Sequence, residues 1–290
     1  MNNQYAMKDR AVLMRLSIGL PGENRQDREV TDKVKASEHL GDKSGKWIKN
    51  LFPSEALAPL KKLDGEARAY HSAVTFPFDA GVGILPAALI LEYADRMRDF
   101  ASKRRNLVQS HFAAKYPEFI EWARKEHNGS FDASLYPPVE EILEKFYFKT
   151  EPLPVPDALH FESTVASLLG TDTDSVNARV AEASKETQRE LLKRMMEPLR
   201  AMATKLAEQP KEGKDCPIFR DTLVSNLAEI VALAPKMNLT GDPEIDAFAA
   251  AMKPLTEVTP QQLRENVSVR GHAAHMAASI LKNLEGYQLA

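Results

Sequence analysis

The most regular hydrophobic pattern of the chain lies in residues 86–127, where apolar side chains recur at the spacing of a helix. The pattern fits a heptad repeat, in which positions a and d face a partner helix. The a positions are Ile90, Met97, Arg104 and His111, and the d positions are Tyr93, Phe100, Leu107 and Ala114. Such a seam has to be covered, so we expect long helices packed on one another. Pro117 should kink or split this helix after Tyr116.

Other segments of the N-terminal half predict a small antiparallel sheet. Residues 11–20 alternate between apolar and polar positions up to Pro21 and Gly22, as a half-buried strand does. Segments 73–78 and 146–150 are rich in residues that favour strands. Residues 23–50 are strongly polar, and we expect a loop or a weakly ordered excursion there.

The C-terminal half is predicted to be helical. Expected helices cover 157–169, 175–208, 217–234, 243–253 and 260–285, with shorter ones at 54–72 and 139–145. Three of the starts combine a polar capping residue with a proline in the first turn, at Asp215, Asp242 and Thr259. Helix 175–208 is long enough to run beside helix 86–116, and we expect the two to pair. If that seam is uncovered instead, it should form a coiled coil with a second copy.

A proline-rich segment, EPLPVPD at residues 151–157, cannot continue a helix. It divides the chain into an N-terminal α+β region, residues 1–156, and a helical region, residues 157–290. One continuous domain is the alternative. In either case the predicted fold class is mainly α (α+β), with a coiled-coil-like seam and a small antiparallel sheet in the N-terminal half.

Composition narrows the function classes. Lysine and arginine number 38 against 41 acidic residues, for a net charge of −3, so no global field draws the chain to nucleic acid or to an anionic membrane. Cys216 is the only cysteine, which excludes an internal disulfide and favours an inert thiol in a reducing compartment. The N-terminus lacks a signal-peptide pattern, and no apolar run is long enough to span a bilayer. We therefore expect a soluble, intracellular protein.

Two basic segments are candidates for contact with nucleic acid. In the first, GDKSGKWIK, three lysines surround a tryptophan, a combination that can contact phosphates and stack on a base; its residues are Lys43, Lys46, Trp47 and Lys49. The alternative for this segment is a solvated loop whose tryptophan docks on the body of the protein. The second segment contains Arg96, Arg98, Lys103 and Arg105. Its charges spread around the helix and are offset by acidic neighbours, which weakens the nucleic-acid interpretation.

Arg104 is unusual because it occupies an a position, where burial is costly without a carboxylate partner. One interpretation is an ion pair that fixes the register of the helices. The other is contact with a ligand or a partner protein. Arg104 and His111, the polar residues at a positions, are therefore our candidates for partner binding.

No catalytic constellation is recognisable in the sequence. His272 and His275 lie three residues apart on a predicted helix, so one face could present both imidazoles to a metal ion. A catalytic zinc site needs a third ligand, and the HExxH pattern is absent. We assign no catalytic residue, no metal and no cofactor.

Residues 51–122 carry a resemblance to a known family. The matching stretches are LFPSEALAPLKKLDGEARAYHSAVTFPFDAG, the following ILP and KYPEFIEW, with weaker echoes in FYFKTEPLPVP and TPQQLREN. They resemble an uncharacterised protein family of bacteriophages and integrative elements. Its members are often encoded near MoxR-type AAA ATPases and von Willebrand A-domain proteins. The resemblance implies an adaptor or substrate role beside such a machine, and it brings no catalytic residues.

Three functional hypotheses follow. The first is a non-enzymatic helical scaffold or adaptor, of phage or mobile-element origin, that binds partner proteins. The second is a DNA-binding accessory factor in phage recombination or replication that uses the two basic segments. The third is a metal-dependent hydrolase that uses His272 and His275. Neither the first nor the second requires a membrane, and a homo-oligomer is compatible with both.

Overall fold

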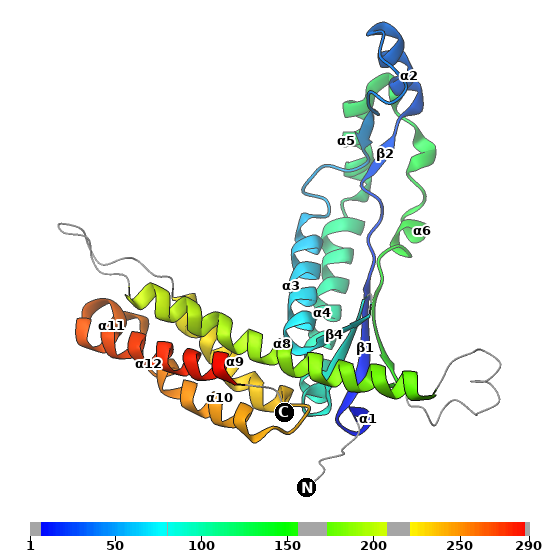
Figure 1. Cartoon of the computed structure of the whole chain (residues 1–290). Coiled ribbons are helices and arrows are strands. Elements are labelled where there is room, and N and C mark those ends of the chain that lie inside the picture. The colour runs from blue at the N-terminus through cyan, green and yellow to red at the C-terminus, as the bar shows by residue number, and fades with distance from the viewer. Residues whose placement is uncertain (1–6, 80, 156–172, 208–220, 288–290) are drawn as a thin grey trace. The chain divides into compact units, whose positions relative to one another are not determined.

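The computed structural model describes residues 7–79, 81–155, 173–207 and 221–287 (Figure 1). The predicted helix 157–169, the predicted helix start at Asp215 and the thiol of Cys216 lie outside these residues. The fold is mainly α with a small antiparallel four-stranded sheet in the N-terminal half, so the predicted fold class is confirmed. Within the described ranges, no helix combines the length and the apolar composition needed to cross a bilayer.

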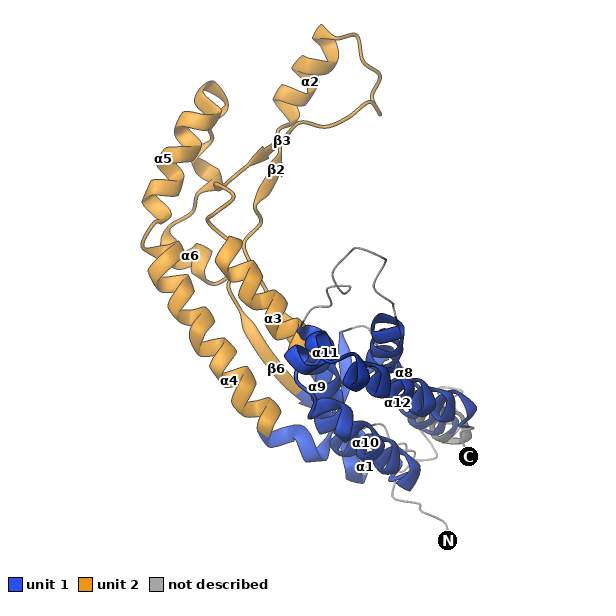
Figure 2. Cartoon of the chain, turned by 90° about the vertical axis from the view of Figure 1, so that its left-hand side faces the viewer, with its two compact units in different colours: residues 1–14, 72–91, 152–290 blue, residues 15–71, 92–151 orange. Residues whose placement is uncertain are grey.

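The chain groups into two compact units, which Figure 2 colours separately. Unit 1 contains residues 1–14, 72–91 and 152–290, and unit 2 contains residues 15–71 and 92–151. Both units are discontinuous in sequence. The predicted division into regions 1–156 and 157–290 stays a prediction.

The four-stranded sheet has the order β4-β5-β1-β6. Its strands are β1 (Ala11–Ile18), β4 (Phe76–Asp79), β5 (Val82–Pro86) and β6 (Phe148–Leu153). Two of the predicted strands correspond to β1 and β6. The third starts later than predicted, at Phe76, because the preceding helix continues through Val74. Strand β5 was not predicted; it is buried along its whole length and pairs antiparallel with β4 through a turn in which Gly81 adopts a positive φ of 72°.

Unit 2 is organised around two helices, α3 (Ala58–Val74) and α4 (Ile90–Leu107). Its other elements are β2 (Asn24–Gln26), α2 (Arg28–Ser37), β3 (Ile48–Asn50), η2 (Val108–Ala113), α5 (Tyr116–His127), η3 (Asn128–Ser130), η4 (Ala133–Leu135) and α6 (Val139–Leu143). Helix α3 covers the buried face of α4, since Tyr70 of α3 packs on Tyr93 and Phe100 of α4. The seam is therefore covered by a helix of its own unit. The predicted pairing of helix 86–116 with helix 175–208 would join the two units and stays a prediction.

The seam of α4 follows the predicted heptad from Tyr93 to Arg104, whereas Ile90, the first predicted a position, is 37% exposed. Beyond Arg104 the buried residues are Val108, Phe112 and Tyr116, where the heptad had predicted the next seam positions at Leu107, His111 and Ala114. The cause is the π-helix η2, because one π-turn contains an additional residue and moves the buried face along the sequence. The helix then ends, and α5 begins at Tyr116 with Pro117 in its first turn, so the helix is split near the predicted position, just before Tyr116 and not after it.

Unit 1 contains the C-terminal helices. These are α8 (Thr173–Ala207), α9 (Thr222–Met237), α10 (Pro243–Thr256), α11 (Pro260–Glu265) and α12 (Val267–Gly286), together with the short α1 (Met7–Arg10) and η1 (Ala87–Leu89). Helix α8 packs against α9 and α12, and its residues Met195, Leu199 and Met202 are fully buried. The predicted caps Asp242 and Thr259 are present, the latter as a capping box. The predicted helix 260–285 is interrupted at Asn266, whose side chain caps α12.

Candidate functional site

Residues 24–50 of unit 2 contain two short strands and a helix, which corrects the prediction of a loop or a weakly ordered excursion for 24–37 and 48–50, while 38–47 form a loop. The strands β2 and β3 pair antiparallel, with Arg25 opposite Lys49, and helix α2 lies between them in sequence. We call residues 24–50 the hairpin-helix segment. It holds all four residues of the first predicted basic segment, so its local geometry decides what they can do.

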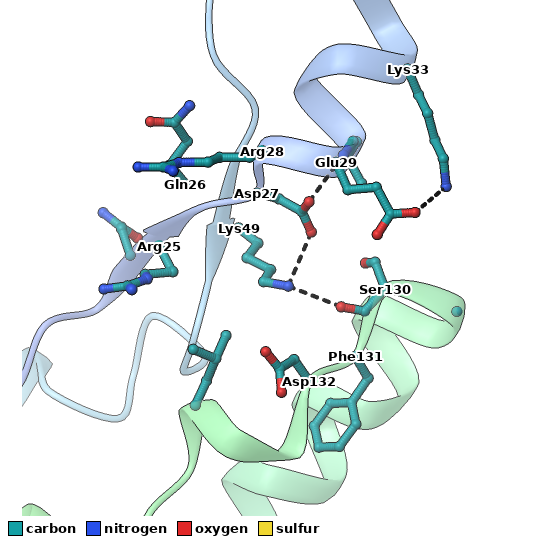
Figure 3. A pocket seen from close by; sticks show the side chains of 14 residues that line it. Arg25, Gln26, Asp27, Arg28, Glu29, Lys33, Lys49, Ser130, Phe131 and Asp132 are labelled. Atoms are coloured by element: carbon teal, nitrogen blue, oxygen red, sulfur yellow. Dashed lines mark hydrogen bonds and ion pairs between the residues drawn. The ribbon is translucent and has the colours of Figure 1, made fainter.

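The segment is held together by the carboxylate of Asp27, the N-cap of α2. Its Oδ1 accepts a hydrogen bond of 3.0 Å from the backbone N–H of Val30, and its Oδ2 accepts one of 3.0 Å from Lys49 Nζ. Lys49 Nζ also donates to the carbonyl oxygen of Ser130 at 2.9 Å, as Figure 3 shows. These bonds join the start of α2, strand β3 and the turn η3.

The ion pair between Asp27 and Lys49 is well removed from water. The Lys49 side chain is 8% exposed and that of Asp27 is 10% exposed. The hydrogen bond from Val30, followed by that from Lys49, lowers the pKa of Asp27, so the carboxylate is ionised at neutral pH. Lys49 therefore has a structural role, because its ammonium group is already bound to Asp27 and Ser130. Its predicted contact with phosphates stays a prediction.

An open cleft of about 1160 Å³ lies beside this ion pair (Figure 3). Its charged lining residues are Arg25, Asp27, Arg28, Glu29, Lys33, Lys49 and Asp132. The two signs nearly balance, and Lys33 is already paired with Glu29. Among the described residues, no carboxylate pairs with Arg25 or Arg28, and both are exposed. The cleft therefore offers two free guanidinium groups but no strong field of one sign.

An apolar patch lies on the same segment. Val34, Leu40 and Trp47 remain 37%, 47% and 53% exposed, and they line a hollow of about 200 Å³ with Lys35 and Lys46. We call these five residues the Trp47 patch. Large apolar side chains that gather at the surface mark interaction sites more often than scattered ones do.

The backbone of Trp47 is fixed although its indole is exposed. Its N–H donates to Thr31 Oγ1 at 2.9 Å, and its carbonyl oxygen accepts from the N–H of Asp27 at 3.0 Å. Thr31 is itself buried and donates to the carbonyl oxygen of Asp27. The indole is thus held out by a backbone that is fixed at two points, and its 53% exposure differs from the predicted alternative of a tryptophan docked on the body. The predicted stacking of Trp47 on a base stays a prediction.

The second basic segment is mostly neutralised on the surface of α4. Lys103 lies 2.7 Å from Asp99 and Arg96 lies 3.7 Å from the same carboxylate, while Arg98 pairs with Asp95. These exposed pairs leave no stripe of free cations, as the charge distribution on the helix predicted. Arg105, which completes the predicted set, is exposed.

Arg104 is 3% exposed, and its Nε donates to Asp64 Oδ1 of α3 at 2.7 Å. The predicted ion pair is therefore present, and its partner is fully buried. His111 is half-buried on η2, and its Nε2–H donates to the carbonyl oxygen of Glu55 at 3.0 Å. Contact of Arg104 or His111 with a partner protein stays a prediction.

His272 and His275 are both exposed on α12. Within the part of the chain that the structure describes, no group of three or more histidine, cysteine, aspartate or glutamate side chains is placed to hold a metal ion.

Sequence reasoning missed Asp27 and Asp64, the carboxylates that organise the hairpin-helix segment and the seam. Asp27 had a readable signal, since an aspartate directly before REVTDKVK has the position of an N-cap. Asp64 had none, because its partner Arg104 lies forty positions later in the chain.

Comparisons with protein-family models, with curated proteins and with solved structures give no match for this chain. The resemblance of residues 51–122 to a bacteriophage family stays a prediction.

Proposed function

We propose that the protein is a non-enzymatic helical adaptor that binds a partner protein through the Trp47 patch. The observation that carries this proposal is the half-exposed indole of Trp47 on a backbone fixed at both its N–H and its carbonyl oxygen. Tryptophan is enriched among the residues that dominate binding energy at protein interfaces. A rigid backbone supports that role because little conformational freedom is lost when the partner docks.

The chemistry of the patch specifies the partner. The lining of the hollow beside Trp47 includes the aliphatic side chains of Val34 and Leu40 and the two lysines, Lys35 and Lys46. Lys43 is exposed in the same loop. A partner that inserts one apolar side chain and flanks it with aspartate or glutamate would match both features, and the opposite charges would speed its association.

The first partners to test are those that the resemblance implies, a MoxR-type AAA ATPase or a von Willebrand A-domain protein. In this proposal the protein originates from a phage or mobile element, and the paired helices α3 and α4 are the scaffold that holds the patch.

A second candidate function, binding of single-stranded nucleic acid, has one observation in its favour. Five cations of the hairpin-helix segment lack a carboxylate partner among the described residues: Arg25, Arg28, Lys35, Lys43 and Lys46. Of these, Lys35 donates a hydrogen bond to the carbonyl oxygen of Asp42. With Trp47 as a stacking platform, they could follow a phosphate backbone. Each phosphate contact would contribute about 0.7 to the slope of log affinity against log salt.

A native affinity purification of the tagged protein from its host cells, without nuclease, tests the proposal. The wild type is compared with Trp47→Ala and with Leu91→Ala, a control that removes an apolar side chain that is 80% exposed on α4. We expect a specific protein to co-purify with the wild type and the control and to be lost with Trp47→Ala. Recovery of nucleic acid that washes off as the salt concentration rises, without a specific protein, would contradict the adaptor proposal and favour the second candidate.

A further inference from the structure

A second cavity of unit 2, of about 360 Å³, lies beside the buried guanidinium of Arg104. Its polar lining residues are Arg104, Arg105, Gln109 and Lys149, and aromatic side chains of residues 146–148 form much of the remainder. We call it the Arg104 cavity. It shares no lining residue with the cleft beside Lys49 or with the Trp47 patch.

Arg104 contributes unused hydrogen-bond donors to this cavity. Its Nε donates to Asp64, and its Nη2 donates to the carbonyl oxygen of Gly19 at 2.6 Å and more weakly to Asp64 Oδ2 at 3.4 Å. No described residue accepts a hydrogen bond from its Nη1. Because a guanidinium carries five N–H donors, the two on Nη1 remain for an acceptor within the cavity.

The charges around the cavity have one sign. No aspartate or glutamate lines it. Asp64, which is not a lining residue, neutralises Arg104, whereas Arg105 and Lys149 are exposed and have no carboxylate partner among the described residues. Lys149 Nζ instead lies 5.8 Å from the centre of the Tyr147 ring. The cavity therefore has an excess of two positive charges.

The wall of the cavity is rigid. Gly19 donates its N–H to the carbonyl oxygen of Tyr147 at 2.9 Å, and a side chain at Gly19 would collide with the Tyr147 ring. The first two residues of the π-helix η2, Val108 and Gln109, also line the cavity. π-Turns are frequent at functional sites, where the inserted residue changes the direction of side chains.

We propose that the Arg104 cavity binds a small phosphate monoester. A phosphate monoester carries close to two negative charges at neutral pH, which matches the excess charge of Arg105 and Lys149. Its oxygens can accept the free N–H groups of Arg104 and the amide of Gln109, and charge-assisted bonds of this kind are among the strongest in proteins. The volume lies in the range of small-molecule sites.

Isothermal titration calorimetry of the full chain tests this site with inorganic phosphate, ribose 5-phosphate and adenosine 5′-monophosphate, and with acetate as a singly charged control. We expect saturable one-to-one binding of at least one phosphate compound and none of acetate. Tighter binding of the adenosine compound than of ribose 5-phosphate would show that the aromatic wall also contacts a base. Equal binding would show that the phosphate alone is recognised.

Substitutions of exposed lining residues test whether the ligand binds in this cavity, and they leave the buried ion pair of Arg104 and Asp64 intact. Arg105→Met and Lys149→Met should each weaken binding about tenfold, which is the loss of one charge-assisted hydrogen bond. Lys145→Met, which removes an exposed lysine outside the lining, should bind like the wild type. The absence of saturable binding at millimolar phosphate would overturn the proposal, and so would affinities unchanged in both cavity variants. Trp47→Ala should not alter this binding, which separates it from the adaptor function.

Discussion

The replacement Arg104→Met should destabilise unit 2 more than any surface substitution. Asp64 is fully buried, and without Arg104 its carboxylate has no counter-charge. Removing one partner of a buried ion pair costs about 3–5 kcal/mol, because the remaining charge stays desolvated. The carbonyl oxygen of Gly19 also loses its 2.6 Å hydrogen bond. A loss of this size is a large part of the 5–15 kcal/mol by which a typical domain is stable.

Urea unfolding followed by tryptophan fluorescence measures the loss of stability in unit 2. Both tryptophans of the chain, Trp47 and Trp122, belong to unit 2, whereas circular dichroism reports on the helices of both units. The fluorescence midpoint should fall strongly in Arg104→Met. Arg98→Met, which opens an exposed pair with Asp95, should shift it far less.

A double variant distinguishes the lost attraction between Arg104 and Asp64 from the penalty of leaving the Asp64 carboxylate buried without a partner. Asp64→Leu combined with Arg104→Met leaves no ion in the seam, and apolar replacement of a whole buried pair is often neutral or stabilising. The double variant should therefore be more stable than Arg104→Met alone. A single variant that costs less than about 1 kcal/mol would refute the reasoning, since it would show that the Asp64 carboxylate is not stranded.

Two further predictions concern the backbone of unit 2. Gly19→Ala would place Cβ in collision with the Tyr147 ring, so it should lower the unfolding free energy by about 1–3 kcal/mol. Gly22→Ala, which has open space around it, should leave the unfolding free energy unchanged, and urea unfolding compares the two variants. Deletion of Ser110, which is exposed within the π-helix, should convert the π-turn to an α-turn and keep the buried face aligned, so its unfolding midpoint should equal or exceed that of the wild type. Deletion of the exposed Glu118 in α5 is its control and should be strongly destabilising, because it turns the following residues by about 100° away from the core. A Ser110 deletion as unstable as this control would show that the π-helix is required for packing.

The sequence predicted the helical scaffold because apolar periodicity is a local signal. The heptad located the buried residues Tyr93, Met97 and Phe100 and singled out Arg104 as a cation in need of a carboxylate. It could not predict the π-turn. In the sequence, one additional residue within a helical turn cannot be distinguished from a change in the spacing of the apolar positions. The pairing of α4 with α3 was also missed. Periodicity shows which face of a helix is apolar, but it does not show which other helix of the chain covers that face.

The candidate site was less accessible to sequence reasoning. Strands β2 and β3 have three residues each, which is too few for an alternation of apolar and polar residues to be recognised. They pair with each other although the helix α2 separates them in the sequence. Lys43, Lys46 and Lys49 look equivalent in the sequence. The fold distinguishes them, because Lys49 is buried on Asp27 while Lys43 and Lys46 remain exposed. The ion pair with Asp27, which the sequence does not reveal, distinguishes the structural Lys49 from the two exposed lysines.

The most direct test of the adaptor account is the affinity of Trp47→Ala for the protein that co-purifies with the wild type. Truncation of a central interface residue costs 2 kcal/mol or more, so we predict affinity at least about thirtyfold weaker. In a Trp122→Phe background, Trp47 is the only tryptophan, and its emission should shift to shorter wavelength as the partner covers it. An unchanged affinity of Trp47→Ala, with no change in the emission of Trp47, would contradict the account.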